Sequence, residues 1–120
     1  MKTVLIVDDE PDVVAVYSLL LEMAGFMVLS APDGRQALTV LKSNVPDVIV
    51  TDWMMPIMNG KALCEALRAH GSTLAHVPII VASAAMHPPE GKQQLYDLFL
   101  RKPLEIGELV EAINVAAGGP

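Results

Sequence analysis

Short apolar runs without regular polar alternation recur along the 120-residue chain, and they restrict its fold more than any other feature. The clearest is Val48–Val50, which leads through Thr51 to Asp52. An aliphatic, β-branched run of this length is typical of a strand buried on both faces, as in a parallel sheet. Similar runs occupy residues 2–7 and 78–82. The sequence therefore predicts an α/β fold built on a parallel sheet.

Helical signals separate these runs. Pro11 suits the first turn of a helix that ends near Gly25, and Asp33 with Gln36 resembles a capping box that starts a second helix. We expect further helices at about residues 60–70, 90–97 and 106–117, and further strands at 26–29 and 99–101. Strands and helices alternate five times with short connections, which predicts a single domain over residues 1–120 with helices on both faces of a five-stranded sheet. The spacing alone leaves the strand order open.

The composition excludes several classes of protein. Apolar residues make up 52% of the chain, which is difficult to reconcile with disorder. Eight basic residues stand against fourteen acidic ones, and the net charge of −6 argues against nucleic-acid binding. The densest apolar segment, residues 13–21, has about half the length needed to cross a bilayer. The single cysteine, Cys64, fits a reducing compartment, so we expect a cytoplasmic protein without membrane association.

Polar residues follow the predicted strands at their carboxyl ends, the edge where open parallel sheets bind ligands. They are Asp8, Asp9, Asp52, Ser83 and Lys102. Three carboxylates at one edge repel each other unless a cation joins them, and oxygen ligands suit Mg²⁺. A lysine and a hydroxyl beside such a metal are the groups that stabilise a phosphoryl group in transfer. Asp52, on the central strand, is the candidate nucleophile.

Each of these residues also has a simpler interpretation when taken alone. The acids before Pro11 suit a helix start, and Asp52 could simply end a strand. Ser83 could be a satisfied core hydroxyl, and the dipeptide at residues 102–103 is common. It is their joint placement at four strand ends that favours a site.

With these residues at its strand ends, the chain resembles the receiver domain of two-component response regulators over essentially its whole length. The matching segments are VLIVDDEP at residues 4–11, DWMMPIMNG at 52–60, SA at 83–84 and FLRKP at 99–103. The resemblance implies a flavodoxin-like (βα)5 three-layer sandwich with the parallel strand order 2-1-3-4-5.

The resemblance also implies roles for the strand-end residues. Asp52 is the expected phosphoacceptor. Mg²⁺ is expected to be held by Asp9, Asp52 and the backbone carbonyl of Met54, with Asp8 acting through water. Lys102 is expected to contact the phosphoryl oxygens and to precede a cis peptide bond.

A conformational switch is the expected output of this chemistry. In the family, Ser83 would also contact the phosphoryl group, and Phe99 occupies the aromatic position that turns inward as it does so. The expected phosphodonor is a histidine kinase or a histidine phosphotransfer protein. Such a domain catalyses its own phosphorylation and dephosphorylation but is not an enzyme for an external substrate. The sequence identifies no output domain or target.

The segment between Ser83 and Lys102 departs from the family pattern. It is shorter than in typical members, and Leu95-Tyr96 stands where the family usually has Gly-Ala. We therefore expect a shortened fourth helix at 90–97. We also expect no dimerisation through the surface formed by this helix, the strand at 99–101 and the last helix at 106–117.

The first helix has apolar residues on more than one face. We expect Val13, Val16, Tyr17, Leu20 and Ala24 to face the sheet. The outward-facing set is then Val14, Ala15, Ser18 and Leu19. An outward patch this apolar suggests docking of the phosphodonor, although a helix that is merely rich in apolar residues would look the same.

Two other functions compete with the phosphorylation switch. A pseudo-receiver would bind partners without phosphate, which the shortened fourth helix favours and the complete acidic set opposes. A phosphatase similar to haloacid dehalogenases would also use an aspartyl nucleophile, but it would need a second aspartate where this chain has Met54.

Overall fold

The computed structural model describes residues 1–69, 73–84 and 95–118. Its elements in chain order are β1 (Thr3–Val7), α1 (Pro11–Met23), β2 (Met27–Ala31), α2 (Gly34–Leu41), β3 (Val48–Thr51), α3 (Gly60–Ala69), the 3-10 helix η1 (Thr73–His76), β4 (Ile79–Ser83), β5 (Leu98–Arg101) and α4 (Ile106–Ala116). Among the described residues, no helix combines the length and the apolar character that a bilayer span requires.

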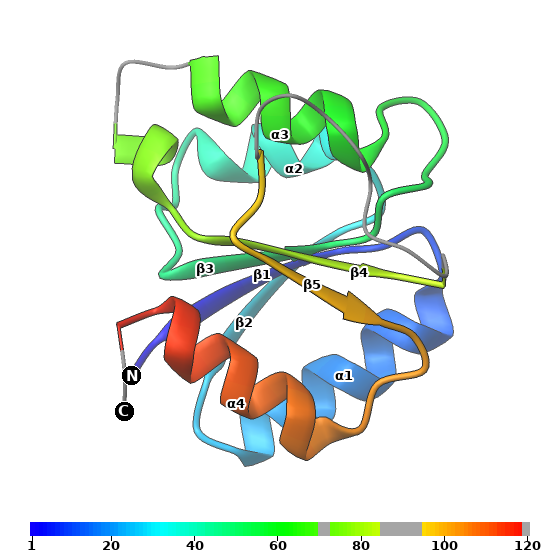
Figure 1. The fold of residues 1–120 in the computed structure, drawn as a ribbon, viewed down its shortest axis with the longest axis vertical. Coiled ribbons are helices and arrows are strands. Elements are labelled where there is room, and N and C mark those ends of the chain that lie inside the picture. Colours follow the sequence, from blue (N-terminus) through cyan, green and yellow to red (C-terminus); the bar gives the residue numbers. More distant parts are fainter. Residues whose placement is uncertain (70–72, 85–94, 119–120) are drawn as a thin grey trace.

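The five strands form one parallel sheet in the order β2-β1-β3-β4-β5. Helices α1 and α4 cover one face of this sheet, and α2 and α3 cover the other (Figure 1). The expected three-layer sandwich and its strand order are therefore confirmed. Most of the expected fourth helix, at 90–97, lies outside the described residues, and the part that is described, 95–97, is not helical.

Alternate side chains of the strands pack into two separate cores, one on each face. Leu5, Val7 and Ile49 join the core under α2 and α3, whereas Val4, Ile6, Val48 and Val50 join the core under α1 and α4. Both sets are buried because helices cover both faces of the sheet. This explains why the strand sequences are continuously apolar rather than alternating.

Local signals set the helix ends as expected. The Asp33 carboxylate accepts a hydrogen bond from the Gln36 N–H at 2.8 Å, which caps α2. Pro11 occupies the first turn of α1, and Gly25 follows its end with φ of 98°, a conformation that favours glycine.

The predicted orientation of α1 is wrong in part. Val16, expected to face the sheet, is 54% exposed, and Ala24 is exposed as well. Val14, expected to face outward, is half-buried and packs into the core with Leu21. Ala15 and Leu19 are exposed as predicted, and Ser18 is half-buried.

The physical reason is that α1 carries apolar residues almost all round. Their spacing does not single out one face, so contact with the sheet decides the rotation of the helix. The exposed apolar stripe of α1 therefore consists of Ala15, Val16, Leu19 and Met23.

Candidate functional site

The sheet register places Asp8 and Asp52 side by side. Val7 and Thr51, the last residues of β1 and β3, are paired, and the next residue in each strand is the aspartate. The N–H of Asp52 donates to the Val7 carbonyl at 2.9 Å, so the ladder extends to the acid itself. Ser83 ends the neighbouring strand β4 and is buried. The predicted gathering of these residues at one sheet edge is therefore observed.

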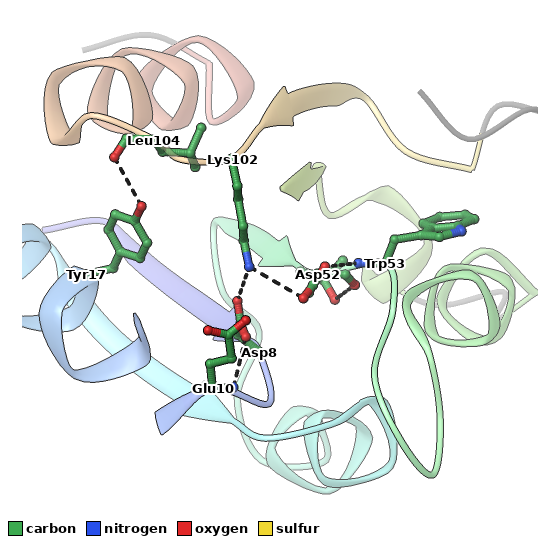
Figure 2. A network of polar contacts seen from close by, with 8 residues as sticks. Asp8, Glu10, Tyr17, Asp52, Trp53, Lys102 and Leu104 are labelled. Carbon is green, nitrogen blue, oxygen red and sulfur yellow. Dashed lines mark hydrogen bonds and ion pairs between the residues drawn. The ribbon is translucent and has the colours of Figure 1, made fainter. Parts of the chain in front are cut away.

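Lys102 reaches both carboxylates from the end of β5. Its Nζ donates to Asp8 Oδ2 at 2.6 Å and to Asp52 Oδ2 at 3.4 Å (Figure 2). The three side chains are only 17%, 5% and 12% exposed for Lys102, Asp8 and Asp52. The backbone N–H of Lys102 donates to the Ser83 carbonyl at 2.8 Å, and the Lys102-Pro103 peptide bond is cis, as expected.

Burial and charge shift the proton affinities of two of these groups. Burial raises the pKa of Asp52, and the nearby Lys102 charge opposes that shift without cancelling it. Burial by itself would lower the pKa of Lys102, but the hydrogen bond to Asp8 and the charges of Asp52 and Asp8 outweigh it and raise that pKa. Lys102 is therefore held in its charged form within a partly desolvated site.

Backbone contacts fix the orientation of the Asp52 carboxylate. The Trp53 N–H donates to Asp52 Oδ1 at 2.7 Å, while Oδ2 faces Lys102. The Thr51 hydroxyl donates to the Asp52 carbonyl at 2.9 Å, and the Gly60 N–H donates to the Trp53 carbonyl at 2.9 Å. The loop from β3 to α3 is thus folded back onto the acid.

Gly60 allows this close approach. A Cβ at this position would overlap the Asp52 carbonyl oxygen and would lie 2.8 Å from the Trp53 Cα. Both neighbours are backbone atoms, which cannot rotate away as a side chain can. Gly60 therefore sets the position of the candidate nucleophile.

We expect Gly60→Ala to displace Asp52 and to lower the free energy of unfolding by about 1–3 kcal/mol, the usual cost of overpacking. Urea unfolding measures this loss. Gly107→Ala in α4 is the matched control, because nothing lies within 4 Å of its added methyl group. That change should leave stability unchanged or raise it by up to about 1 kcal/mol. Equal effects of the two substitutions would contradict the role assigned to Gly60.

An acidic cluster at this edge could hold a metal ion. Carboxylate oxygens of Asp8, Asp9 and Asp52 lie within 4.8 Å of one another, with Asp9 the most exposed. In an octahedral Mg²⁺ site, opposite ligands are about 4.2 Å apart, twice the usual metal–oxygen distance. The spacing and the all-oxygen ligand set therefore fit a hard divalent cation.

Phe99, Met54 and Cys64 are not part of this acidic cluster. Phe99 is half-buried on β5 and packs against the core under α2 and α3. The Met54 side chain is 73% exposed in the loop after Asp52, and the metal-binding role of its carbonyl stays a prediction. Cys64 is buried on α3, and burial raises the pKa of its thiol to about 11, so it is a core residue.

Three sets of contacts were not anticipated from the sequence. Arg68 of α3 donates to the Ala75, Val77 and Leu95 carbonyls and pairs with Asp97 at 2.8 Å, which anchors the start of β5. The Trp53 and Tyr96 rings meet edge to face at 6.1 Å, and the Tyr17 hydroxyl donates to the Leu104 carbonyl. The contacts that involve Leu95, Tyr96 and Leu104 join segments far apart in the sequence, so no local motif signals them.

Comparison with known proteins agrees with this geometry. A family model described as the response regulator receiver domain matches residues 4–114. The transcriptional regulatory protein PrrA of Mycobacterium bovis is 38% identical over 114 residues, covering 92% of this chain and 48% of the relative. The phosphate regulon transcriptional regulatory protein PhoB of Pseudomonas aeruginosa is 37% identical over 116 residues, 94% of this chain and 50% of the relative. The chain thus spans about half the length of these relatives.

Solved structures show the same fold. The chemotaxis response regulator CheY4 of Vibrio cholerae superimposes with a TM-score of 0.85 at 30% identity, covering 97% of this chain and 98% of the other. The receiver domain of a sensor histidine kinase from Pseudomonas aeruginosa, determined with magnesium in its active-site cleft, gives a TM-score of 0.87 at 26% identity and covers 98% of both chains.

Proposed function

The chain belongs to the response regulator receiver domain family, and we propose that it accepts a phosphoryl group on Asp52 in a Mg²⁺-dependent reaction. The observation that carries the proposal is the Lys102 ammonium group, which lies 2.6 Å from Asp8 and 3.4 Å from Asp52 at the end of the parallel sheet. A carboxylate nucleophile, an adjoining acidic cluster and a fixed cation are the groups that phosphoryl transfer to an aspartate requires.

In the proposed reaction an Asp52 carboxylate oxygen attacks the phosphorus atom, and the bond from phosphorus to the donor breaks. The product is an acyl phosphate on Asp52. The Trp53 N–H orients the carboxylate, and Lys102 stabilises negative charge on the transferring oxygens, with Ser83 as a further hydroxyl beside them. Asp9, Asp52 and the Met54 carbonyl would hold Mg²⁺, with Asp8 acting through water; the ion would neutralise further charge on the phosphoryl group.

The proposed consequence is a conformational switch that controls a partner or an attached output domain. Phosphorylation would draw in Ser83 and shift the position of Phe99, which already packs against the core. A histidine kinase or histidine phosphotransfer protein is the proposed donor. The domain would promote only its own phosphorylation and dephosphorylation, and a cytoplasmic location is part of the same proposal.

Intact-mass measurement after incubation with acetyl phosphate tests the proposal. With Mg²⁺ present we expect a phosphate adduct, and an excess of chelator should remove the ion and prevent the adduct. A wild-type protein that is folded, that binds Mg²⁺ and that forms no adduct would instead support a pseudo-receiver.

The apolar side chain of Met54 predicts a long-lived acyl phosphate. It is exposed in the loop that follows Asp52 and has no group that could orient or deprotonate an attacking water. We expect Met54→Asn to shorten the lifetime of phosphorylated protein by up to about tenfold, the effect of one added hydrogen bond that orients the attacking water. Adduct decay after removal of the donor measures it. Equal lifetimes would show that Met54 does not control hydrolysis.

The exposed stripe of α1 is the proposed docking surface for the phosphodonor protein. Among the exposed apolar residues of this helix, Leu19 is 60% exposed and can be replaced without disturbing the core. Leu19→Glu should slow transfer from a cognate kinase at least about fivefold, because it places a charge in an apolar contact. Phosphorylation by acetyl phosphate should be unchanged.

Val45→Glu is the matched control for this docking prediction, because Val45 is equally exposed at 60% but lies between α2 and β3. Equal slowing with the kinase and with acetyl phosphate would contradict a docking role for α1.

A further inference from the structure

Tyr17 connects α1 to the turn that carries Lys102. Its hydroxyl donates to the Leu104 carbonyl at 3.1 Å, across 87 positions of sequence (Figure 2). Leu104 lies two residues after Lys102, in the connection from β5 to α4. The hydrogen bond therefore holds the connection that follows the lysine.

The Lys102 side chain borders a small cavity and is therefore not fully enclosed by packed atoms. A cavity of about 20 Å³ lies on the α1 and α4 face of the sheet, lined by the polar residues Asp8, Asp52 and Lys102 and mainly by aliphatic side chains such as Val50 and Leu109. Tyr17 and Leu104 line the same cavity. Because this side of the Lys102 chain is not filled by packed atoms, van der Waals contact does less to fix its position.

The strand before Lys102 also restrains it on one side only. Within the described part of the chain, β5 is paired with β4 alone and is partly exposed. The Lys102 N–H is bonded to the Ser83 carbonyl, which fixes the lysine relative to β4. The Tyr17 hydrogen bond supplies a restraint from the other direction, through α1.

We propose that Tyr17 is a positioning residue that keeps Lys102 directed at Asp8 and Asp52. The inference rests on the proposed phosphoacceptor function and extends it to a residue outside the polar cluster. Loss of the hydroxyl lets the turn at residues 102–104 move, and the ammonium group then spends less time at the two carboxylates. Tyr17 also ties the position of the lysine to α1, the helix that carries the proposed docking stripe.

A simpler role for the Tyr17 hydroxyl is to satisfy its own hydrogen bond at a half-buried position. The two roles differ in one measurable respect. If Tyr17 acts through Lys102, its removal has a smaller effect when Lys102 is already absent; if it acts alone, the effect is the same in both backgrounds.

The experiment compares wild type, Tyr17→Phe, Lys102→Met and the double variant. Two quantities are measured: the phosphorylation rate with saturating acetyl phosphate and Mg²⁺, and the urea midpoint of unfolding in Mg²⁺-free buffer. Thr39→Val is the matched control, because it also removes a hydroxyl bonded to a backbone carbonyl, on α2 at the opposite face of the sheet.

We expect Tyr17→Phe to slow phosphorylation of otherwise wild-type protein about threefold to tenfold, as for the loss of one oriented hydrogen bond. In the Lys102→Met background the rate should not fall further, and the shift in urea midpoint should be smaller than in wild type. Thr39→Val should change the phosphorylation rate and the urea midpoint by the same factor and the same shift in wild type and in Lys102→Met.

An unchanged rate in Tyr17→Phe, or an equal midpoint shift in both backgrounds, overturns the proposal for Tyr17. If wild type forms no adduct at all, the phosphoacceptor function fails, and the urea midpoints alone then decide whether Tyr17 and Lys102 are coupled.

Discussion

Asp52→Asn is expected to abolish the phosphate adduct, because the amide replaces the nucleophilic carboxylate oxygens with groups that do not attack phosphorus. The shape of the side chain is kept, and its oxygen can still accept the hydrogen bond from the Trp53 N–H. Intact-mass measurement with acetyl phosphate and Mg²⁺ checks the result.

The same substitution should not unfold the protein. Burial raises the pKa of Asp52 above that of the unfolded chain, so its ionised form costs stability at neutral pH. The neutral amide removes that cost, and we expect the urea midpoint in Mg²⁺-free buffer to be equal to wild type or higher. A folded Asp52→Asn variant that still forms the full adduct would place the acceptor elsewhere.

Asp47→Asn is the matched control. Asp47 precedes β3 at the end opposite to Asp52, is exposed, and accepts a hydrogen bond from the Thr3 N–H at 2.7 Å that an amide oxygen can also accept. The Asp47→Asn protein should form the phosphate adduct to the same extent as wild type.

Lys102→Met should slow phosphorylation by about 10²–10³-fold, the range found when one preorganised group that stabilises transition-state charge is removed. Methionine keeps much of the side-chain length and apolar character, so the change removes mainly the ammonium group that lies between Asp8 and Asp52. The rate is measured with acetyl phosphate at saturating Mg²⁺, so that loss of the lysine charge is not confused with altered metal occupancy.

Lys61→Met provides the control for net charge. Lys61 is exposed on α3, and the ion pairs of Asp8 and Asp52 in the described part of the chain are made with Lys102, so replacing Lys61 removes the same charge without removing one of these pairs. A loss of rate in Lys61→Met as large as that in Lys102→Met would indicate a general charge effect and contradict the role of Lys102.

Most of the fold could be predicted because its local signals agree. Each central strand is a continuous apolar run, and caps such as Asp33 mark where a helix begins. The strand order could not be obtained from alternating short units alone, and it came from the resemblance. The rotation of α1 could not be predicted because apolar residues surround that helix, and burial of Leu21 depends on the sheet beneath it.

The polar centre of the site was predictable for a related reason. Residues that follow parallel strands lie at one edge of the sheet, and the strand order implied by the resemblance makes the strands of Asp8 and Asp52 neighbours, so these two acids were expected to lie close together. The contacts that hold this polar centre in position could not be predicted from the sequence. Tyr17 and Leu104 are joined by one hydrogen bond between distant segments, and the contact of Gly60 with the Asp52 carbonyl arises only after the loop has folded back.

The central claim is that Asp52 itself carries the phosphoryl group. Borohydride reduces an aspartyl phosphate to homoserine, so reduction of phosphorylated protein followed by peptide sequencing identifies the modified residue. We predict homoserine at position 52 only, and none when Mg²⁺ is removed before the donor is added. Homoserine at Asp8 or Asp9 with an unmodified Asp52 would contradict the account.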